Sequence, residues 1–270
     1  MLLQKIKQKI KRKREHKSNH KSSTLVIRPD DVFIVSYPKS GNTWVRFLFA
    51  NLLKPDSVPL INFHNVHDYC PSGDGSNEQI NQLPSPRILK SHQSCNPKFP
   101  KVIYIVRDGR DVYISYFHYL KQSLAPNCSL QDFMVNNTSP FGSWSDHIKS
   151  WLDAKHRNES NFLLVRYEDL LQDTYASFKK MAKFAGFDVS SAAIASAVGN
   201  SNFVHMQNIE RKYGRKYSND SADSFVRRGE SGEWKECFGE EEWEIFQSKE
   251  DSRLLEKLGY YIPTLVTSKS

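Results

Sequence analysis

The sequence predicts an α/β fold in which helices flank a central parallel sheet. Short runs of β-branched and apolar residues alternate with stretches of helical periodicity along most of the chain, which is the pattern of repeated strand–helix–strand units. The 270 residues, of which 39% are hydrophobic and 12% aromatic, are enough to bury the core of one such domain. We therefore expect a single domain at residues 25–264, preceded by a tail at 1–24 and followed by a short tail at 265–270.

Four strands are expected, each a short apolar run that ends in polar or turn residues. They lie at residues 32–36, 87–90, 102–107 and 162–166. The longest apolar stretches of the chain belong to these strands, and they are far shorter than the roughly 20 residues of a membrane-spanning helix. We therefore expect a soluble protein.

Helices are expected between and after these strands, because apolar residues recur there at spacings of three and four. Their predicted bounds are 43–53, 110–121, 143–157, 175–185 and 240–258. Two segments lack this periodicity. Residues 54–86, which contain five prolines, are expected to form an irregular insertion beside the sheet, and the polar residues 210–223 a mobile loop.

The formal charge of +8 lies in the N-terminal tail. Residues 1–21 contain nine Lys or Arg and one Glu, whereas the remaining 249 residues carry 29 basic and 29 acidic side chains. A neutral body gives no reason to expect specific binding of nucleic acid. The spacing of Leu2, Ile6 and Ile10 would allow a short basic helix on an anionic membrane, and a solvated, disordered arm is the simpler interpretation.

Cysteine usage and the N-terminus favour a reducing compartment. The four cysteines lie far apart and form no CxxC pair, at positions 70, 95, 128 and 237. This spacing predicts neither a disulfide framework nor a zinc site. No apolar signal core precedes Leu25, so we expect a cytoplasmic protein without a structural metal.

The first motif with chemical meaning lies between the strand at 32–36 and the helix at 43–53, and it reads SYPKSGNTW. A strand-to-helix turn presents backbone N–H groups and the positive end of the helix dipole, to which a phosphate binds. Gly41 would let the backbone come close, Lys39 adds a charge, and the hydroxyls of Ser40 and Thr43 can donate. The lysine precedes the glycine, so this is not the GxxxxGK[ST] loop. The alternative is an ordinary turn with a helix-capping hydroxyl.

Two further basic motifs are expected at the same edge of the sheet. Arg107 ends the strand at 102–107, and Ser115 lies on the first turns of the helix that follows. Arg227 and Arg228 belong to FVRRGESGEWK, residues 225–235, directly after the polar loop. Two phosphate sites at one sheet edge indicate a nucleotide. The alternative for the later pair is that both arginines are simply solvated.

These segments, in this order, resemble the cytosolic-type sulfotransferases, which use the sulfate donor 3′-phosphoadenosine 5′-phosphosulfate (PAPS). The loop at 37–44 differs from the family's YPKSGTTW only at Asn42. The family's K-x-H, G-S-W and Y-E-D motifs match residues 90–92, 142–144 and 167–169, and His147 and Trp151 also match. The resemblance covers about residues 30 to 260 and implies a modified, P-loop-like nucleotide-binding fold.

The resemblance also implies a role for each matching residue. Donor contacts are expected from the loop, the two arginine segments and an aromatic pocket for adenine: Lys39, Ser40, Gly41, Asn42, Thr43, Trp44, Arg107, Ser115, Tyr167, Ser201, Phe203, Arg227, Arg228 and Gly229. His92 would be the general base and Lys39 the stabiliser of the leaving group, with Lys90 and Ser115 as further catalytic residues. For Trp44 the alternative is a core residue, and for His92 a merely hydrogen-bonded one.

The implied reaction moves the sulfuryl group from PAPS to a hydroxyl, or less readily an amine, of a small-molecule or glycan acceptor. The product of the donor is PAP (adenosine 3′,5′-bisphosphate), and the reaction requires no metal. Two other functions stay open. A P-loop kinase would require a Gly-Lys pair, which is absent, and a magnesium-binding carboxylate, for which Asp108 is the one candidate. A non-catalytic adaptor for anionic ligands would use the tail and leave the Lys39, Arg107 and Arg228 segments without a purpose.

Departures from the family pattern affect the acceptor and the oligomer. The family's dimerisation stretch, K-x-x-x-T-V-x-x-x-E, would run from Lys235 to Glu244, but Gly239 and Glu240 replace the Thr-Val pair. The usual dimer is therefore in doubt. The acceptor pocket would be formed by residues 54–86, by residues 116–147 and by the polar loop, which are the least family-like parts, so the acceptor is left open.

Overall fold

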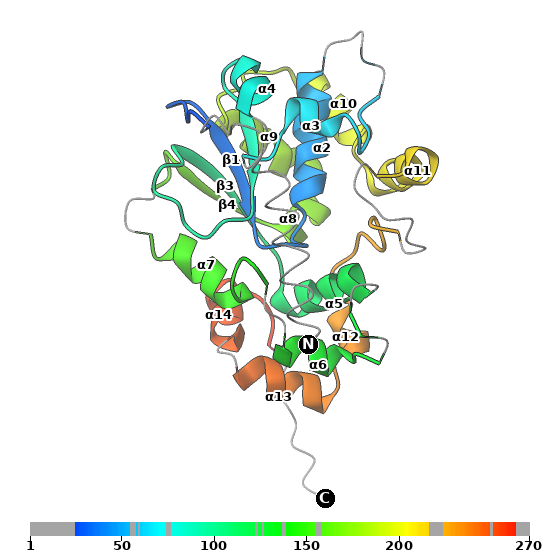
Figure 1. The fold of residues 1–270 in the computed structure, drawn as a ribbon. Helices are drawn as coiled ribbons and strands as arrows, with labels where there is room; N and C mark the ends of the chain where they lie inside the picture. The colour runs from blue at the N-terminus through cyan, green and yellow to red at the C-terminus, as the bar shows by residue number, and fades with distance from the viewer. Residues whose placement is uncertain are drawn as a thin grey trace, which may run out of the picture.

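A four-stranded parallel sheet forms the centre of the computed structural model (Figure 1). The order of its strands is β2-β1-β3-β4, with bounds β1 Val32–Ser36, β2 Ile88–Ser91, β3 Lys101–Val106 and β4 Phe162–Arg166. All four expected strands are confirmed, β2 and β3 with a shift of one residue. The structure describes residues 25–54, 58, 60–73, 77–121, 124–125, 127–136, 139–154, 158–215, 224–248 and 251–262.

The position of β1 in the sheet determines where a site can form. The chain runs from β1 to β2 on one side and then to β3 on the other side, so the connections leave the carboxyl end of β1 in opposite directions. In open α/β sheets a crevice forms at such a switch point. All five residues of β1 are buried, as expected for a strand that is covered on both faces.

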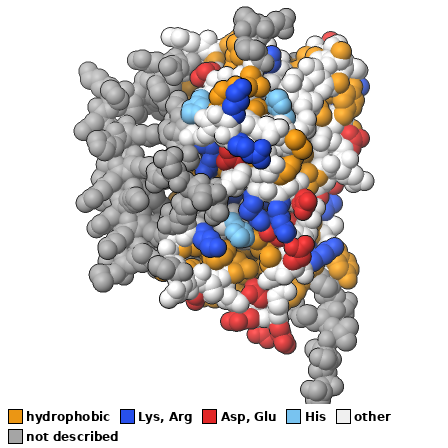
Figure 2. All heavy atoms as spheres, turned by 90° about the vertical axis from the view of Figure 1, so that its right-hand side faces the viewer, with side chains coloured by type: hydrophobic (Ala, Val, Ile, Leu, Met, Phe, Trp, Pro, Cys, Tyr) orange, Lys and Arg blue, Asp and Glu red, His pale blue; other side chains and the backbone are white. Residues whose placement is uncertain are grey.

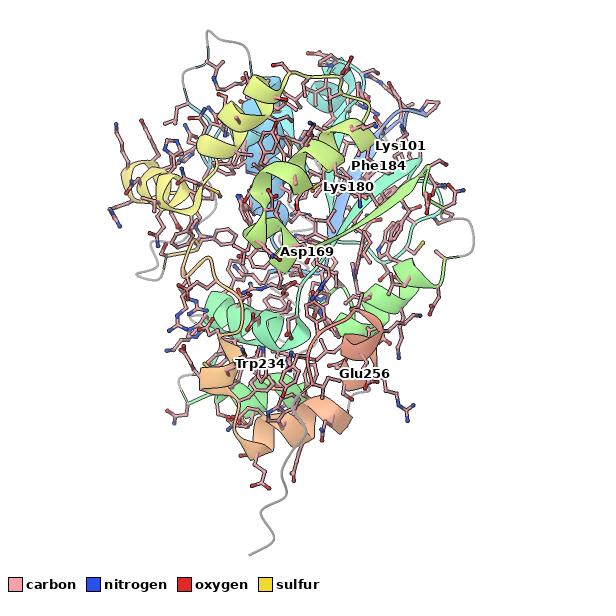
Figure 3. The ribbon with its side chains drawn as sticks, turned by 180° about the vertical axis from the view of Figure 1, so that it is seen from behind. Lys101, Asp169, Lys180, Phe184, Trp234 and Glu256 are labelled. Atoms are coloured by element: carbon pink, nitrogen blue, oxygen red, sulfur yellow. The ribbon has the colours of Figure 1, made fainter. Side chains whose placement is uncertain are left out.

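Two apolar clusters cover the two faces of the sheet. Phe33 and Val35 of β1 belong to one cluster, and the alternating residues Val32 and Ile34 belong to the other. The helices that contribute to the Val32 cluster surround the upper part of Figure 1: α2 Asn42–Leu53, α3 Val66–Tyr69, α8 Tyr167–Gln172, α9 Thr174–Phe184, α10 Ser191–Gly199 and α11 Phe203–Tyr213. At the back, Lys101 at the start of β3 lies 6.0 Å from the ring of Phe184 on α9 (Figure 3).

The Phe33 cluster extends into a helical layer at the lower end of the sheet (Figure 1). This layer consists of α5 Gly109–Leu120, α6 Leu130–Asn136, α7 Trp144–Leu152, α12 Trp234–Cys237, α13 Glu240–Ser248 and α14 Asp251–Lys257. Trp144 and Trp151 of α7 are fully buried in it. The apolar face predicted for this helix is therefore confirmed, although the helix ends at Leu152 and not at 157.

Several elements differ from the sequence prediction. The segment 54–86 contains the short helices α3 and α4 Asn77–Gln82 and an isolated parallel bridge between Ser72 and Lys90. The expected helix at 240–258 is two helices, α13 and α14. Helix α11 extends into the expected loop as far as Tyr213, and residues 216–223 of that loop lie outside the described residues.

The two tails, residues 1–24 and 265–270, also lie outside the described residues. The basic residues of the N-terminal tail, and with them its proposed membrane contact, are therefore not addressed by the structure. Among the helices of the described ranges, none combines the length and the apolar character that crossing a bilayer requires.

A buried ion pair joins the start of β1 to the start of β2. Arg87 donates to both carboxylate oxygens of Asp31, over 2.7 and 2.6 Å, and both side chains are completely buried. Arg87 also donates to the carbonyl of Val26, over 2.7 Å. The pair therefore ties the segment before β1 to the edge of the sheet.

We predict that Asp31→Ala lowers the free energy of unfolding by about 3 to 5 kcal/mol, because it leaves the Arg87 guanidinium buried without its carboxylate. Urea denaturation measures the change. The control is Asp153→Ala, which removes the exposed pair with Lys257 and should cost less than about 1 kcal/mol. Equal, small losses for the two variants would show that the buried pair does not hold the sheet edge.

Candidate active site

The carboxyl ends of β1, β2 and β3 open into one cavity of about 530 Å³. Figure 2 shows Lys and Arg side chains in the middle of the face that contains α11 and α5, with hydrophobic patches above and below. Most of the residues that the sequence singles out line this cavity: Lys39, Gly41, Asn42, Thr43, Trp44, Lys90, His92, Arg107, Ser115, Tyr167, Phe203, Arg227, Arg228 and Gly229. Ser40 and Ser201 do not line it.

The loop between β1 and α2 has an unusual backbone. Lys39 and Gly41 have φ values of 70° and 97°, and Gly41 is the N-cap of α2. A Cβ atom at Gly41 would lie 2.7 Å from a ring carbon of Tyr167, so both the conformation and the space require glycine. The loop therefore brings the first amide groups of α2 to the cavity wall, where they and the helix dipole favour an anion.

Two polar side chains of this loop point away from the solvent. The Asn42 amide donates to the carbonyl of Ile34 and to the hydroxyl of Ser36, over 3.1 and 3.3 Å, and so fixes the loop to β1. The side chain of Asn42 is thus held by the strand. The Ser40 hydroxyl is buried and has no hydrogen-bond partner in the part of the chain that the structure describes. It is an available donor for an anion at the loop.

The ammonium group of Lys39 lies against two aromatic rings. Its Nζ is 3.9 Å from the ring centre of Phe225 and 4.6 Å from that of Tyr119. Burial, together with the nearby charges of Arg107 and other arginines, lowers the pKa of Lys39 to about 7. The centre of the cavity is therefore electropositive, and an anion there would favour the charged form of Lys39.

Arg107 connects three segments around the cavity. Its guanidinium donates to the carbonyl of Lys39 over 3.2 Å and to that of Glu230 over 3.0 Å, and it lies 4.5 Å above the ring of Tyr167. Asp111, one helical turn further along, lies 3.8 Å away. The Nε of Arg107 is buried without a partner among the described residues, so part of this cation stays available to a ligand.

Residues 224–235, which we call the closing segment, form one wall of the cavity and are held at both ends by carboxylates. Glu210 accepts from the amides of Phe225 and Val226, over 2.8 and 2.9 Å. Asp111 accepts from the amides of Gly232 and Trp234, over 2.7 and 3.0 Å. Neither acid belongs to one of the sequence motifs described above. The signal for Asp111 was its position four residues after Arg107 on a predicted helix.

The adjacent arginines of the closing segment have carboxylate partners. Arg227 forms a two-point ion pair with Glu233, and Arg228 lies 2.9 Å from Glu236 and 3.6 Å from Glu233. Gly229 has a φ of 69°, and a Cβ atom there would overlap the ring of Phe203. The segment therefore turns sharply against Phe203 and presents its two cations at the cavity.

Three aromatic residues form the wall next to the loop. The rings of Trp44 and Tyr167 meet at 71° with centres 5.9 Å apart, and Phe203 completes this wall of the cavity. The indole N–H of Trp44 donates to the carbonyl of Ser201 over 2.8 Å. The Ser201 hydroxyl accepts from Asn51, so this buried serine positions Trp44 and does not itself face the cavity.

His92 follows β2 and is fixed in one tautomer. Its Nδ1 lies 2.7 Å from the carbonyl oxygen of Ser36, which can only accept, so Nδ1 carries the proton and Nε2 keeps its lone pair. Burial, together with the charge of Lys90, lowers the pKa of His92 to about 3. The imidazole is therefore neutral at physiological pH and can accept a proton at Nε2.

Two residues of α7 hold the backbone next to His92. His147 Nε2 donates to the carbonyl of His92 over 3.2 Å, because its Nδ1 accepts from the hydroxyl of Tyr104 over 2.8 Å. Trp151 donates to the carbonyl of Gln93 over 3.1 Å. These contacts explain the presence of His147 and Trp151 without placing either one at the reacting centre.

No cluster of three or more His, Cys, Asp or Glu side chains suited to a metal ion occurs among the described residues. The cavity presents backbone amides, hydroxyls, lysine and arginines, which together suit a ligand with several negative charges.

Comparison with known proteins identifies the family. A family model described as the sulfotransferase domain matches residues 29–258. The chain belongs to the sulfotransferase family. Among its relatives, sulfotransferase 2B1 of Mus musculus is 34% identical over 245 residues, which are 84% of this chain and 72% of the relative. The amine sulfotransferase of Oryctolagus cuniculus is 30% identical over 250 residues, 82% of this chain and 79% of the relative.

A solved structure agrees with this assignment. The crystal structure of mouse sulfotransferase SULT7A1 complexed with PAP has a TM-score of 0.68 and 26% sequence identity, and the match covers 88% of this chain and 91% of that one. Every segment of the cavity described above lies within the matched sulfotransferase domain. The family assignment favours a transferase over the kinase and the adaptor.

We predict that Asp111→Asn loosens the closing segment of this sulfotransferase, because an amide cannot accept from both the Gly232 and the Trp234 N–H groups. Loss of such a buried hydrogen bond corresponds to roughly a tenfold increase in the hydrogen-exchange rate of the backbone amides that it holds. Exchange at residues 224–235, followed by mass spectrometry, measures it. Asp169→Asn, on the exposed back of α8 (Figure 3), is the control and should leave that exchange unchanged. Unaltered exchange in Asp111→Asn would contradict the anchoring role.

Proposed function

We propose that this sulfotransferase moves the sulfuryl group of PAPS to a hydroxyl group of a small-molecule acceptor. The observation that carries the proposal is a neutral His92 with a free Nε2 in the same cavity as Lys39 and the N-terminus of α2. Such a cavity combines a proton acceptor with an anion site. The similarity to a mouse relative in complex with PAP supports PAPS as the donor.

The chain's own groups fit the two charged ends of this donor. The buried, unpartnered hydroxyl of Ser40, the amides after Gly41 and the side chain of Thr43 suit the 5′-phosphosulfate. Around Arg107, whose Nε lacks a partner among the described residues, four further residues suit the 3′-phosphate: Ser115, Arg227, Arg228 and Gly229.

The base of the donor would lie between the aromatic residues of the wall next to the loop. Trp44, Tyr167 and Phe203 offer flat apolar faces there, and Ser201 fixes the indole by its carbonyl. When bound, PAPS supplies a sulfuryl group on a phosphate leaving group. The residues present fit PAPS and require no metal contact.

Transfer would then depend on position and electrostatics. His92 Nε2 takes the proton of the acceptor hydroxyl, whose oxygen forms a bond to sulfur as the bond between sulfur and the bridging phosphate oxygen breaks. Lys39 stabilises the negative charge that develops on that oxygen, with Lys90 and Ser115 beside the path. The aromatic contacts of Lys39 can be exchanged for this stronger interaction with an anion.

Other properties stay predictions. They are a cytoplasmic location, a domain at residues 25–264, and a basic tail that is either a solvated arm or in weak contact with anionic membranes. The family's usual dimer stays in doubt, because Gly239 and Glu240 replace the Thr-Val pair. An amine is the less favoured acceptor group, and a glycan is the alternative to a small-molecule acceptor. The similarity to a rabbit amine sulfotransferase is a reason to test amines.

The proposal is tested by transfer of labelled sulfate from PAPS to phenols, alcohols, amines and glycans, with equal rates expected in EDTA and in magnesium. In calorimetry, adenosine 3′,5′-bisphosphate should bind at least about 100-fold more tightly than adenosine 5′-monophosphate, because Arg107, Arg227 and Arg228 gain charge-assisted contacts only with the 3′-phosphate. Equal affinities would contradict the two-phosphate site.

We predict that His92→Ala lowers kcat by about 10²- to 10⁴-fold, the range of general-base catalysis, and leaves the affinity for PAP nearly unchanged. Lys39→Ala should weaken PAP binding as well as lower kcat. Because the pKa of His92 is about 3, its protonation should not reduce wild-type kcat/KM between pH 8 and about pH 5. Near wild-type turnover of an aliphatic alcohol by His92→Ala would remove the assignment of the base.

A further inference from the structure

A second buried arginine lines the cavity, and the reaction described above does not use it. Arg46 lies on α2, three residues after Thr43, and only 4% of its surface is exposed. It is two residues from Trp44, or about 200° around the helix, so the two side chains leave α2 in opposite directions. Arg46 therefore points away from the aromatic wall that contains Trp44.

The hydrogen bonds of Arg46 hold only one side of its guanidinium. Nε and Nη2 donate to the carbonyl of Cys70, over 2.9 and 2.6 Å, and Nη2 lies 2.9 Å from Nδ1 of His67. Within the described ranges, Nη1 donates to no protein group, and it is not fully enclosed by protein atoms. Arg46 lines the cavity, and Nη1 is the nitrogen of its guanidinium that is left to meet a ligand there.

No carboxylate of the described residues neutralises Arg46. Its contacts are a carbonyl oxygen and an imidazole nitrogen, and its charge is retained although burial lowers its pKa. A buried cation on a cavity wall, with a carbonyl partner on one side and an N–H group without a protein partner, is a suitable receptor for an anion. This arrangement differs from that of the buried Arg87, which is bound by the carboxylate of Asp31.

The surroundings of Arg46 place it on the side of the cavity where His92 lies. The amide of Lys90 donates to the carbonyl of Pro71 over 2.8 Å, so the segment that holds Arg46 runs beside the end of β2. The charges of Lys90 and Arg46 both act on His92, which follows two residues later. The same region of the wall also contains the apolar side chains of Phe63 and Val66.

We propose that the acceptor carries an anionic group on an apolar body, and that Arg46 binds this group through Nη1 while the acceptor hydroxyl meets His92. A carboxylate, a sulfate and a phosphate share the required chemistry. The inference rests on the proposed function, because it describes the acceptor of the same reaction. The donor does not account for Arg46, since its phosphates are assigned to the loop, Arg107 and the closing segment.

An anion at Arg46 would also act on the base. Burial is the main cause of the low pKa of His92, and the charges of Lys90 and Arg46 lower it further. An anionic group between Arg46 and the hydroxyl offsets part of this positive field and makes Nε2 a stronger proton acceptor. A neutral acceptor would lack this effect, so the charge of the acceptor influences both binding and the proton transfer.

The test compares each carboxylate acceptor with its neutral primary amide of the same shape. The pairs are 4-hydroxybenzoate, 4-hydroxyphenylacetate and 3-(4-hydroxyphenyl)propanoate with their amides, and 4-hydroxybenzenesulfonate with its sulfonamide. For the spacing that fits, kcat/KM should favour the anion at least about tenfold, as expected for a charge-assisted hydrogen bond. Most of the difference should be in KM.

Arg46→Gln removes the charge and keeps an amide that can donate toward Cys70, and it should bring the ratio of anion to amide close to one. Arg46→Lys should restore part of the preference. Arg211→Gln, at an exposed position of α11 outside the cavity, makes the same change of charge and should keep the wild-type ratio. Thermal unfolding and PAP affinity are measured for every variant.

The outcomes separate this inference from the function on which it rests. A wild-type ratio near one, or a ratio that Arg46→Gln leaves unchanged, overturns the anionic acceptor while transfer to the amides upholds the sulfotransferase reaction. Absence of transfer to every acceptor, together with no binding of PAP, overturns the proposed function itself. Should Arg46→Gln fail to fold, the wild-type ratio and Arg46→Lys decide the question.

Discussion

The left-handed backbone of the loop between β1 and α2 is the constraint on which the site depends. Positive φ values at Lys39 and Gly41 turn the chain tightly over the end of the strand. The carbonyl of Ser36, at the start of this turn, fixes the tautomer of His92, and the carbonyl of Lys39 binds Arg107. One short piece of backbone thus orients His92 and Arg107, which follow different strands. The ring of Tyr167 packs against Gly41 and leaves no room for a side chain at that position.

Three cations of the cavity wall are bound mainly by neutral groups. Arg46 and Arg107 are held mainly by carbonyl oxygens, and Lys39 by aromatic faces. Two acids nearby, Glu210 and Asp111, bind backbone amides of the closing segment. The positive charges of Lys39, Arg46 and Arg107 are thus left available at the cavity, whereas the carboxylates of Glu210 and Asp111 hold the wall around it in place.

Much of this arrangement could be predicted from the sequence. The strands of the sheet are continuous apolar runs, and the loop at 36–44 combines a lysine, a glycine and hydroxyl side chains between a strand and a helix, so both could be recognised. Helices α10 and α11 were missed because the first consists of small residues and the second is polar on most of its surface. Contacts such as Trp44 with Ser201 join residues 157 positions apart, and no local pattern contains them. Arg46 was missed because a single arginine within an apolar helix carries no motif.

The pairing of Arg227 and Arg228 with Glu233 and Glu236 gives the closing segment a built-in competitor for anions. A phosphate that binds these arginines must displace the carboxylates of Glu233 and Glu236. Both carboxylates belong to the same part of the chain, so they can pair with the arginines again when the phosphate dissociates. The net gain on binding is therefore smaller than for two solvated arginines, and dissociation is assisted. If these arginines bind the 3′-phosphate as proposed, the same exchange would help the spent donor to leave and would limit product inhibition.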